Sequence, residues 1–255
     1  MPVPSVPEPF YWTNEAWGPA LRCRALDPIA PHLFTSRALQ LSSAEGRMAA
    51  AHAIGAAEAV MVTQVHGNGV VVVRRGEARP SAATAADVLV SDDPQVAVAV
   101  RAADCVPLLL GDRRTGAVAA VHAGWRGMLA GIVPATVAEV AARSGTAPAN
   151  LRVALGPSID GCCFEIEREI AARFAERFGD GVWQAWRDGG SGRAPGKGTL
   201  DLRRVGRRIL LDAGVPDEAI EFVGPCTFCG DSGFASYRRD GANAGRQSSW
   251  IGIET

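Results

Sequence analysis

The sequence predicts an α+β fold, a single domain of mixed β-sheets sandwiched by helices. Six short runs rich in β-branched residues follow one another between residues 60 and 123, and segments with helical spacing lie before and after them. The apolar runs are continuous rather than alternating, which is typical of strands that are covered on both faces. A chain of 255 residues can bury a sizeable core, so we expect one domain over 1–255.

The N-terminal half begins with short strands and loops and continues into a dense β region. A strand is expected over 32–37. A helix is expected over 42–54, where serines can cap its start and Gly55 follows its end. Turn-forming residues separate the runs of the β region. Its six predicted strands are VMVTQV (60–65), VVVVRR (70–75), DVLVSD (87–92), VAVAVR (96–101), VPLLLGD (106–112) and AVAAVHA (117–123).

Helices and strands alternate in the C-terminal half. Apolar periodicity predicts a helix over 128–142, and LRVAL (151–155) predicts a strand that Gly156 and Pro157 end. The segment DGGSGRAPGKG (188–198) is rich in Gly, Ser and Pro and predicts a mobile loop. It does not predict a domain boundary, because the chain beyond it is too short for a separate core. The remaining predicted elements are helices over 165–178 and 201–213 and strands over 220–224 and 248–253.

Composition and charge limit the classes of partner. The net charge of -1 gives no electrostatic reason to expect nucleic acid or an anionic membrane. No apolar run approaches the roughly 20 residues of a membrane span. The first ten residues, MPVPSVPEPF, lack the charged and apolar regions of a secretory signal. We therefore expect a cytoplasmic protein.

Six cysteines are present, and in a reducing compartment we interpret them as thiols, ligands or nucleophiles rather than disulfides. Cys226 and Cys229 form a lone C-x-x-C. A zinc knuckle needs a second pair at similar spacing, which adjacent Cys162 and Cys163 do not provide. A thioredoxin-like motif should open a helix, whereas Gly-Asp-Ser-Gly follows here. We therefore interpret the C-x-x-C pair as ordinary thiols.

His66, Cys105 and His122 share one kind of position, at predicted strand ends beside tight turns. Two imidazoles and a thiolate suit a borderline-soft ion such as zinc and poorly suit magnesium or calcium. Three protein ligands leave a fourth position open, as in a catalytic zinc site. Gly67 and Gly124, beside the two histidines, would let backbone and substrate approach closely.

The same residues allow two other classes of function. Cys105 and His122, with Asp104 nearby, can form the thiolate–imidazolium pair of a cysteine hydrolase or deamidase. A third imidazole that points at the sulfur would argue for a metal instead. A zinc-dependent module that binds a nucleotide or a cell-wall fragment without turnover is the other alternative.

Several motifs together resemble one family. QVHG, ADCVP, HAGWRG, GPSI…CCFE and CT…SYRRDG…GR occur in this order between about Phe34 and Ile253. They are similar to those of the YfiH-like, laccase-domain-containing proteins, once named multicopper polyphenol oxidases and now assigned as zinc-dependent purine nucleoside phosphorylases with adenosine deaminase side activity. Four histidines cannot furnish several copper centres, so the oxidase name fits these residues poorly.

The resemblance implies a fold related to the cytotoxic-necrotizing-factor and YfiH-like cysteine hydrolases. It implies that His66, Cys105 and His122 hold Zn²⁺ and are catalytic, with copper as an adventitious alternative. It further implies one laccase-like domain that splits adenosine, inosine, guanosine or methylthioadenosine with phosphate into free base and ribose 1-phosphate. The expected partners are the nucleoside and phosphate alone, without nucleic acid or membrane, and the protein is expected to be a monomer or a homodimer.

Arginines are the expected phosphate ligands, because a guanidinium binds phosphate with two hydrogen bonds. Residues 236–240 predict a strand, on which adjacent side chains point to opposite faces. We therefore expect Arg238 to face the pocket, while Arg239 pairs elsewhere, for instance with Asp240. The substrate-binding set is Arg37, Arg126, Arg238 and Arg246.

Overall fold

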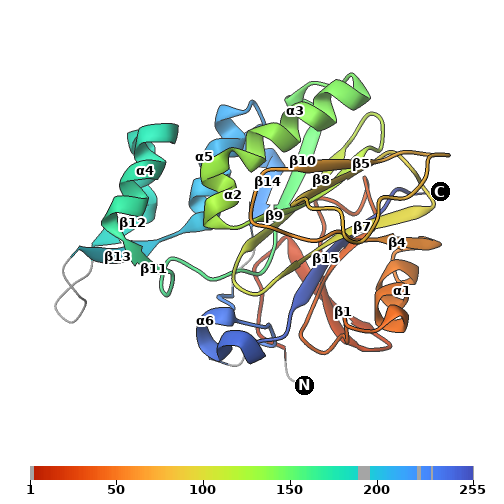
Figure 1. Ribbon diagram of the computed structural model, residues 1–255, viewed down its shortest axis with the longest axis horizontal. Coiled ribbons are helices and arrows are strands. Elements are labelled where there is room, and N and C mark those ends of the chain that lie inside the picture. Colours follow the sequence, from red (N-terminus) through yellow and green to blue (C-terminus); the bar gives the residue numbers. More distant parts are fainter. Residues whose placement is uncertain (1–2, 189–195, 223–224, 231, 255) are drawn as a thin grey trace.

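Three β-sheets form the framework of the computed structural model, which describes residues 3–188, 196–222, 225–230 and 232–254 (Figure 1). The first sheet contains, in spatial order, β1 (Phe10–Glu15), β2 (Gly18–Cys23), β3 (His32–Thr35), β15 (Gln247–Ile251), β7 (Val96–Ala102) and β4 (Glu58–Val60). The second contains β14 (Ile220–Phe222), β10 (Leu151–Leu155), β8 (Val106–Asp112), β9 (Val118–Ala123), β6 (Val88–Ser91) and β5 (Val70–Val73). The third contains β11 (Glu165–Glu167), β13 (Lys197–Leu200) and β12 (Trp186–Asp188).

Both large sheets are mixed, since each combines antiparallel and parallel strand pairs. The described α-helices are α1 (Ala44–His52), α2 (Trp125–Ala130), α3 (Ile132–Ser144), α4 (Arg168–Phe178), α5 (Leu202–Asp212) and α6 (Tyr237–Asp240). Short 3₁₀ turns lie at Pro148–Asn150, Asp180–Ala185, Asp217–Ala219 and Gly241–Asn243. No helix in these ranges is both long enough and apolar enough to cross a membrane.

The two large sheets pack face to face, and helices cover their outer faces. Along β7, Val98 and Val100 belong to the core between the sheets, whereas Ala97 and Ala99 pack with α1 on the outside. On β9, Ala120 lies in the inter-sheet core and Val121 faces the helices. Both faces of each strand are therefore apolar, which confirms the inference drawn from the continuous runs.

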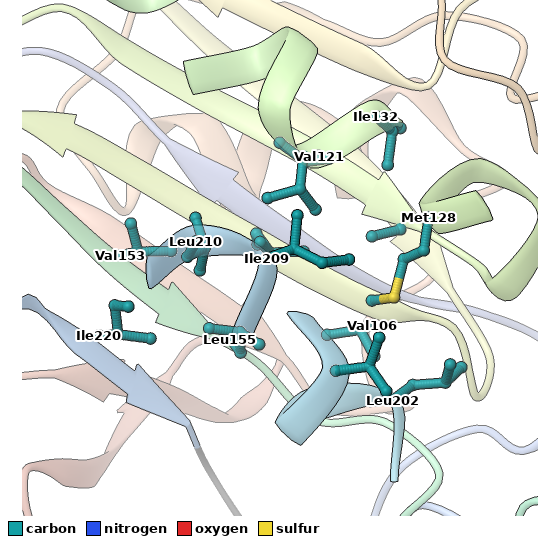
Figure 2. Packing of buried hydrophobic residues seen from close by; sticks show 14 of the residues in the cluster. Val106, Val121, Met128, Ile132, Val153, Leu155, Leu202, Ile209, Leu210 and Ile220 are labelled. Carbon is teal, nitrogen blue, oxygen red and sulfur yellow. The ribbon is translucent and has the colours of Figure 1, made fainter. Parts of the chain in front are cut away.

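The helical side of the second sheet has the largest hydrophobic cluster (Figure 2). Met128 from α2 and Ile132 from α3 are completely buried there, and α5 adds Leu210. Figure 1 shows α2, α3 and α5 on this face and α1 on the opposite side of the molecule. The prediction of mixed sheets sandwiched by helices is confirmed at this level.

The strand predicted from local propensity over 60–65 is wrong, because the chain leaves the first sheet there and forms a loop. The run VMVTQV was expected to be a strand over 60–65, but β4 ends at Val60 and Thr63 makes only an isolated bridge with Ala85. Val65 is 53% exposed, and its N–H donates to the carboxylate of Asp87 rather than to a strand. The residues beyond Val60 therefore form a loop that the Asp87 side chain organises.

Two other predicted elements differ in kind. The first residues of the predicted helix 165–178 form β11, because they pair with β13 of the unexpected third sheet. The strand predicted for residues 236–240 is also wrong, because residues 237–240 form a short helix. Ser236 caps the short helix α6 by accepting a hydrogen bond from the N–H of Arg239. The predicted mobile loop 188–198 is wrong at its ends, because Asp188 belongs to β12 and Lys197 and Gly198 belong to β13. Its central part stays a prediction, because residues 189–195 lie outside the described ranges.

The predicted helix 128–142 is divided into α2 and α3 at Gly131, which has φ 88°. A Cβ atom at this position would also lie 2.8 Å from Nη2 of Arg177. Gly131→Ala is expected to lower the free energy of unfolding by about 1–2 kcal/mol, because a left-handed backbone is strained for alanine. Urea unfolding measures this loss. Exposed Ala142→Lys, within α3, should change stability by less than about 0.5 kcal/mol; an equal loss in both variants would contradict the explanation.

Candidate metal centre

His66, Cys105 and His122 converge on one point. Their ligand atoms all lie within 4.8 Å of one another. The pairing of β8 with β9 places Val106 opposite Ala123, which brings the neighbouring residues Cys105 and His122 together. His66 reaches them from the loop after β4, and its ring meets that of His122 edge-on with centroids 4.8 Å apart.

Buried Asp87, directly before β6, organises this centre. Its Oδ1 accepts hydrogen bonds from Nδ1 of His122 at 2.8 Å and from the N–H of His66 at 3.0 Å. Its Oδ2 accepts from the N–H of Gly67 at 2.7 Å and of Val65 at 3.2 Å. Because a carboxylate only accepts, Nδ1 of His122 carries a proton and Nε2 is the nitrogen that faces the centre. This is the usual support for a histidine that binds a metal.

Unusual backbone conformations hold two residues of the site. His66 has φ 61° and Asp104 has φ 84°, values that residues other than glycine rarely adopt. The Asp104 carboxylate accepts hydrogen bonds from the hydroxyl of Thr227 and from the N–H of Arg238, both at 2.6 Å. These bonds fix the turn that presents Cys105.

Because Gly124 has no side chain, it leaves room for the side chains of Cys105 and His66. A Cβ atom built there would lie 3.0 Å from Sγ of Cys105 and 3.3 Å from Cδ2 of His66. A larger residue would push the thiol or the imidazole aside. The close approach expected from a glycine beside His122 is therefore present in the structure.

The three side chains perturb one another electrostatically. Burial raises the pKa of Cys105, but hydrogen bonds with His122 and His66 outweigh burial and bring the pKa to about 6. Burial lowers the pKa of His122, but hydrogen bonds with Asp87 and Cys105 raise it to about 9. Cys105 is therefore a thiolate at neutral pH, as a metal ligand must be.

A cavity of about 750 Å³ opens onto the centre. His66, Cys105 and His122 form part of its wall, with Asp104 beside them. Further lining residues are Gln64, Arg101, Ala102, Ala103, Ile159, Phe164, Tyr237, Arg238 and Arg246. The wall thus combines metal-ligand chemistry, cationic groups and aromatic surface.

The expected arginines occupy different places. Arg238 and Arg246 line the cavity. Arg37 and Arg126 are exposed and are not among its described lining residues; the guanidinium of Arg126 stacks on the ring of Trp125, 4.5 Å from its centroid. Arg239 forms an ion pair with Asp240 at 2.8 Å. The orientation expected for the adjacent pair occurs, although on a helix and not on a strand.

Sequence reasoning missed Asp87 and Arg101. Asp87 lies in a segment interpreted only as a strand, and its four donors come from two distant parts of the chain. Arg101 ends a strand-like run, and its backbone is fixed by the side chain of Gln64 through bonds of 2.7 and 2.8 Å. The glutamine in QVHG was the available signal for this contact.

The residues present fit a transition-metal ion. Two imidazole nitrogens and a thiolate converge, the proton of His122 is fixed on the nitrogen that faces away, and both imidazoles hydrogen-bond the same sulfur. The second imidazole on the sulfur, that of His66, favours a metal centre over a cysteine nucleophile. Cys105 and His122 alone would suffice for a nucleophile pair.

Comparison with known families agrees with the motifs. Residues 38–254 match the family model described as "Multi-copper polyphenol oxidoreductase laccase". The chain belongs to this family. The match spans the metal centre and every described lining residue of the cavity. Strands β1, β2 and β3 precede the matched residues.

Relatives of this laccase-family protein have names that denote enzymes. It is 34% identical over 260 residues to "Purine nucleoside phosphorylase slr1573" of Synechocystis sp., covering 95% of this chain and 96% of that relative. It is 37% identical over 163 residues to "Adenosine deaminase RL5" of an unknown prokaryotic organism, covering 63% of this chain and 59% of that relative. The crystal structure of YlmD from Geobacillus stearothermophilus superposes with a TM-score of 0.82 at 30% identity, covering 97% of this chain and 100% of that one.

Proposed function

We propose that this protein is a single laccase-like domain that catalyses the zinc-dependent phosphorolysis of purine nucleosides and deaminates adenosine as a side activity. One arrangement carries the proposal: metal ligands and arginines share the wall of a cavity that a nucleoside and a phosphate can fill. The names of its relatives support the same reaction. Adenosine, inosine, guanosine and methylthioadenosine are the proposed substrates, and the cytoplasm is the proposed location.

Zinc is the proposed metal, because one thiolate and two imidazoles are typical of a catalytic zinc with an open fourth position. When bound, Zn²⁺ would supply a Lewis acid that polarises a substrate atom or activates water. His66, Cys105 and His122 would hold it, and Asp87 would orient His122. Copper would be an adventitious occupant, and kinship with the cysteine hydrolase fold is likewise a proposal.

Arginines on the cavity wall would bind the phosphate nucleophile. Among the described residues, Arg101, Arg238 and Arg246 form no ion pair. Arg238 donates to the carbonyl oxygens of Glu165 at 3.2 Å and Cys163 at 3.5 Å, which position its guanidinium without neutralising it. Its remaining N–H groups are free to bind an anion.

Aromatic surface near Arg238 would receive the purine. Phe164 lies under the Arg238 guanidinium, 5.6 Å from ring centroid to Cζ, and Tyr237 is 56% exposed at the cavity wall. A planar base can stack on such rings while the ribose faces the metal centre. Phosphate and nucleoside would then lie side by side, as nucleophilic attack requires.

The deciding experiment is a nucleoside panel with and without phosphate. Free base and ribose 1-phosphate should form only when phosphate is supplied, because phosphate is the proposed nucleophile. Inosine and adenosine are the first substrates, and ammonia release from adenosine measures the deaminase reaction separately. Equal release of base in phosphate-free buffer would make the enzyme a hydrolase and overturn the phosphorylase assignment.

Arg238→Ala and Arg246→Ala are each expected to raise KM for phosphate about tenfold or more, because a charge-assisted contact to the anion is lost. KM for the nucleoside and the zinc content should change little. Initial rates at varied phosphate concentration measure the effect. Arg37→Ala and Arg126→Ala are the matched controls outside the cavity, and an increase confined to these two would place the phosphate elsewhere.

A cysteine hydrolase that uses Cys105 and His122 is the second candidate, because the pKa of Cys105 lies near 6. A chelator separates the two reactions. A metal enzyme loses activity in the chelator and regains it when zinc is restored, whereas a thiolate nucleophile is indifferent to the chelator and is inactivated by alkylation. A nucleotide-binding module would bind nucleosides without turnover in either case.

A further inference from the structure

A second cluster of metal-ligand side chains lies apart from the His66–Cys105–His122 centre. Cys162 and Cys163 lie in the turn between β10 and β11, and Cys226 and Cys229 lie after β14. All four Sγ atoms are within 4.8 Å of one another. The sulfur of Cys229 is 3.5 Å from that of Cys162 and 3.3 Å from that of Cys163, and the adjacent pair is 3.4 Å apart. We call these four residues the cysteine quartet.

We propose that the cysteine quartet binds one structural zinc ion. Zn–S bonds of about 2.3 Å in a tetrahedron place the sulfurs roughly 3.8 Å apart. The sulfur–sulfur distances in the quartet begin at 3.3 Å and stay within 4.8 Å, so they bracket this value. Four protein ligands fill the coordination shell, so the site would be closed and structural rather than catalytic.

Packing does not account for the quartet. Cys162 and Cys229 are exposed, Cys163 is half-buried, and only Cys226 is buried. Thiols used as small apolar residues lie inside a core, as Cys23 does between the two large sheets. Four thiols gathered at the surface from two segments far apart in sequence are instead typical of a ligand set.

The backbone around the quartet is already fixed. The N–H of Asp160 donates to Sγ of Cys226 at 3.3 Å, and the N–H of Thr227 donates to the carbonyl of Ser158 at 3.1 Å. The N–H of Cys163 donates to the carbonyl of Asp160 at 2.9 Å and closes the turn that carries both adjacent cysteines. An N–H donor to a sulfur stabilises the thiolate form that a metal requires. Adjacent Cys162 and Cys163 thus present their sulfurs to one point, contrary to the sequence-based interpretation.

The clustered thiols perturb one another's pKa. Burial raises the pKa of Cys162 to about 12 and raises the pKa of Cys163 as well. Hydrogen bonds from Cys163, and then from Cys162, lower the pKa of Cys229. A divalent ion bound by the four sulfurs would displace their protons and balance the charge of the thiolates.

The quartet would act as a clamp on one wall of the substrate cavity. The carbonyl of Cys163 accepts a hydrogen bond from Arg238, and Thr227, next to Cys226, donates to Asp104 beside Cys105. Zinc would join the two segments that carry these contacts. The ion would thereby set the position of Arg238 and of the turn at Asp104 without touching the substrate.

Metal content of the full-length protein, purified without chelator under reducing conditions, tests the proposal. The unaltered protein should contain about two zinc ions per chain, one in each ligand set. The double variant Cys226→Ser/Cys229→Ser should retain about one, and so should His66→Ala/His122→Ala, whose remaining zinc belongs to the quartet. Cys23→Ala, outside both sets, should retain both ions.

Because a quartet variant can fail to fold, the unaltered protein supplies a second measurement. Alkylation of the native protein, mapped by peptide mass spectrometry, should spare the four quartet cysteines until a strong chelator is added, after which all four should react. Quartet cysteines that react fully without chelator, in a protein with a single zinc ion, would overturn the proposal. Disulfide-linked quartet peptides after purification under reducing conditions would overturn it equally.

Discussion

His122→Ala and Cys105→Ala are each expected to empty the His66–Cys105–His122 centre and to lower kcat/KM for purine nucleosides by at least about 10³-fold, or about 4 kcal/mol of transition-state stabilisation. His122 is 3% exposed and is held between Asp87 and Cys105, so its loss removes one of the three ligand side chains that meet in the described part of the chain. The fold should persist, because the centre lies at strand ends rather than within the inter-sheet core.

Metal analysis, circular dichroism and steady-state kinetics together check this result. His52→Ala is the matched control, since His52 is exposed on α1 and remote in the fold from the second sheet. It should keep its zinc and its activity. Full zinc content at the centre in the Cys105→Ala protein would refute the ligand assignment, and full activity in a zinc-depleted protein would refute the proposed role of the metal.

The layers of the fold were predictable because strand burial leaves a local trace. The run over 96–101 is apolar at every position up to Arg101, and the structure buries valines on one face and alanines on the other. Strand β10 coincides with the predicted residues 151–155. Such runs depend on the nearest layers alone, so a short window of sequence contains the information.

The predictions of secondary structure were wrong where a distant side chain or a backbone angle decided the structure. Nothing local in VMVTQV indicates that the carboxylate of Asp87 draws its last residues out of the sheet. Gly131 is compatible with a continuous helix by composition, and only its positive φ reveals the break between α2 and α3. The serine at 236 was a cap signal that the strand interpretation overlooked.

The metal centre was predictable from the sequence, whereas the cysteine quartet was not. The histidines and the cysteine of the centre were grouped by their positions at predicted strand ends, and the resemblance supported this grouping. The quartet joins residues 162 and 163 to residues 226 and 229 through the placement of two turns, and no spacing rule connects the pairs. Three-dimensional proximity alone reveals it.

Asp87→Asn is expected to destabilise the protein by about 3–5 kcal/mol and to weaken zinc binding at the His66–Cys105–His122 centre about 10- to 100-fold. Asp87 is fully buried and accepts four hydrogen bonds. An amide can accept with one end only, so its NH₂ group would face the N–H donors of the loop or of His122. The loss of the negative charge also removes the partner that fixes the His122 proton on Nδ1.

The contribution of Asp87 to the stability of the fold should depend on pH. Burial raises the pKa of Asp87, but the hydrogen bonds from His122 and the loop N–H groups outweigh burial and hold the pKa below its usual value. A depressed carboxyl pKa contributes stability that is complete above the unfolded-state value of about 3.9 and disappears as the pH falls through the folded-state value. The gap in stability between the unaltered protein and Asp87→Asn should therefore be full at neutral pH and shrink in acid.

Two measurements distinguish a role of Asp87 in orienting the ligand His122 from a role in holding the loop alone. Urea unfolding of metal-free protein reports stability alone, and competition with a chelator at a temperature where both proteins are folded reports zinc affinity. Asp92→Asn is the matched control, because Asp92 is exposed just beyond the far end of β6 and accepts a hydrogen bond from the N–H of Arg75. If Asp87→Asn lost stability but bound zinc at the centre as tightly as the control, Asp87 would hold the loop and not the metal ligand. A parallel loss of both would show that the carboxylate couples the fold of the QVHG loop to the metal centre.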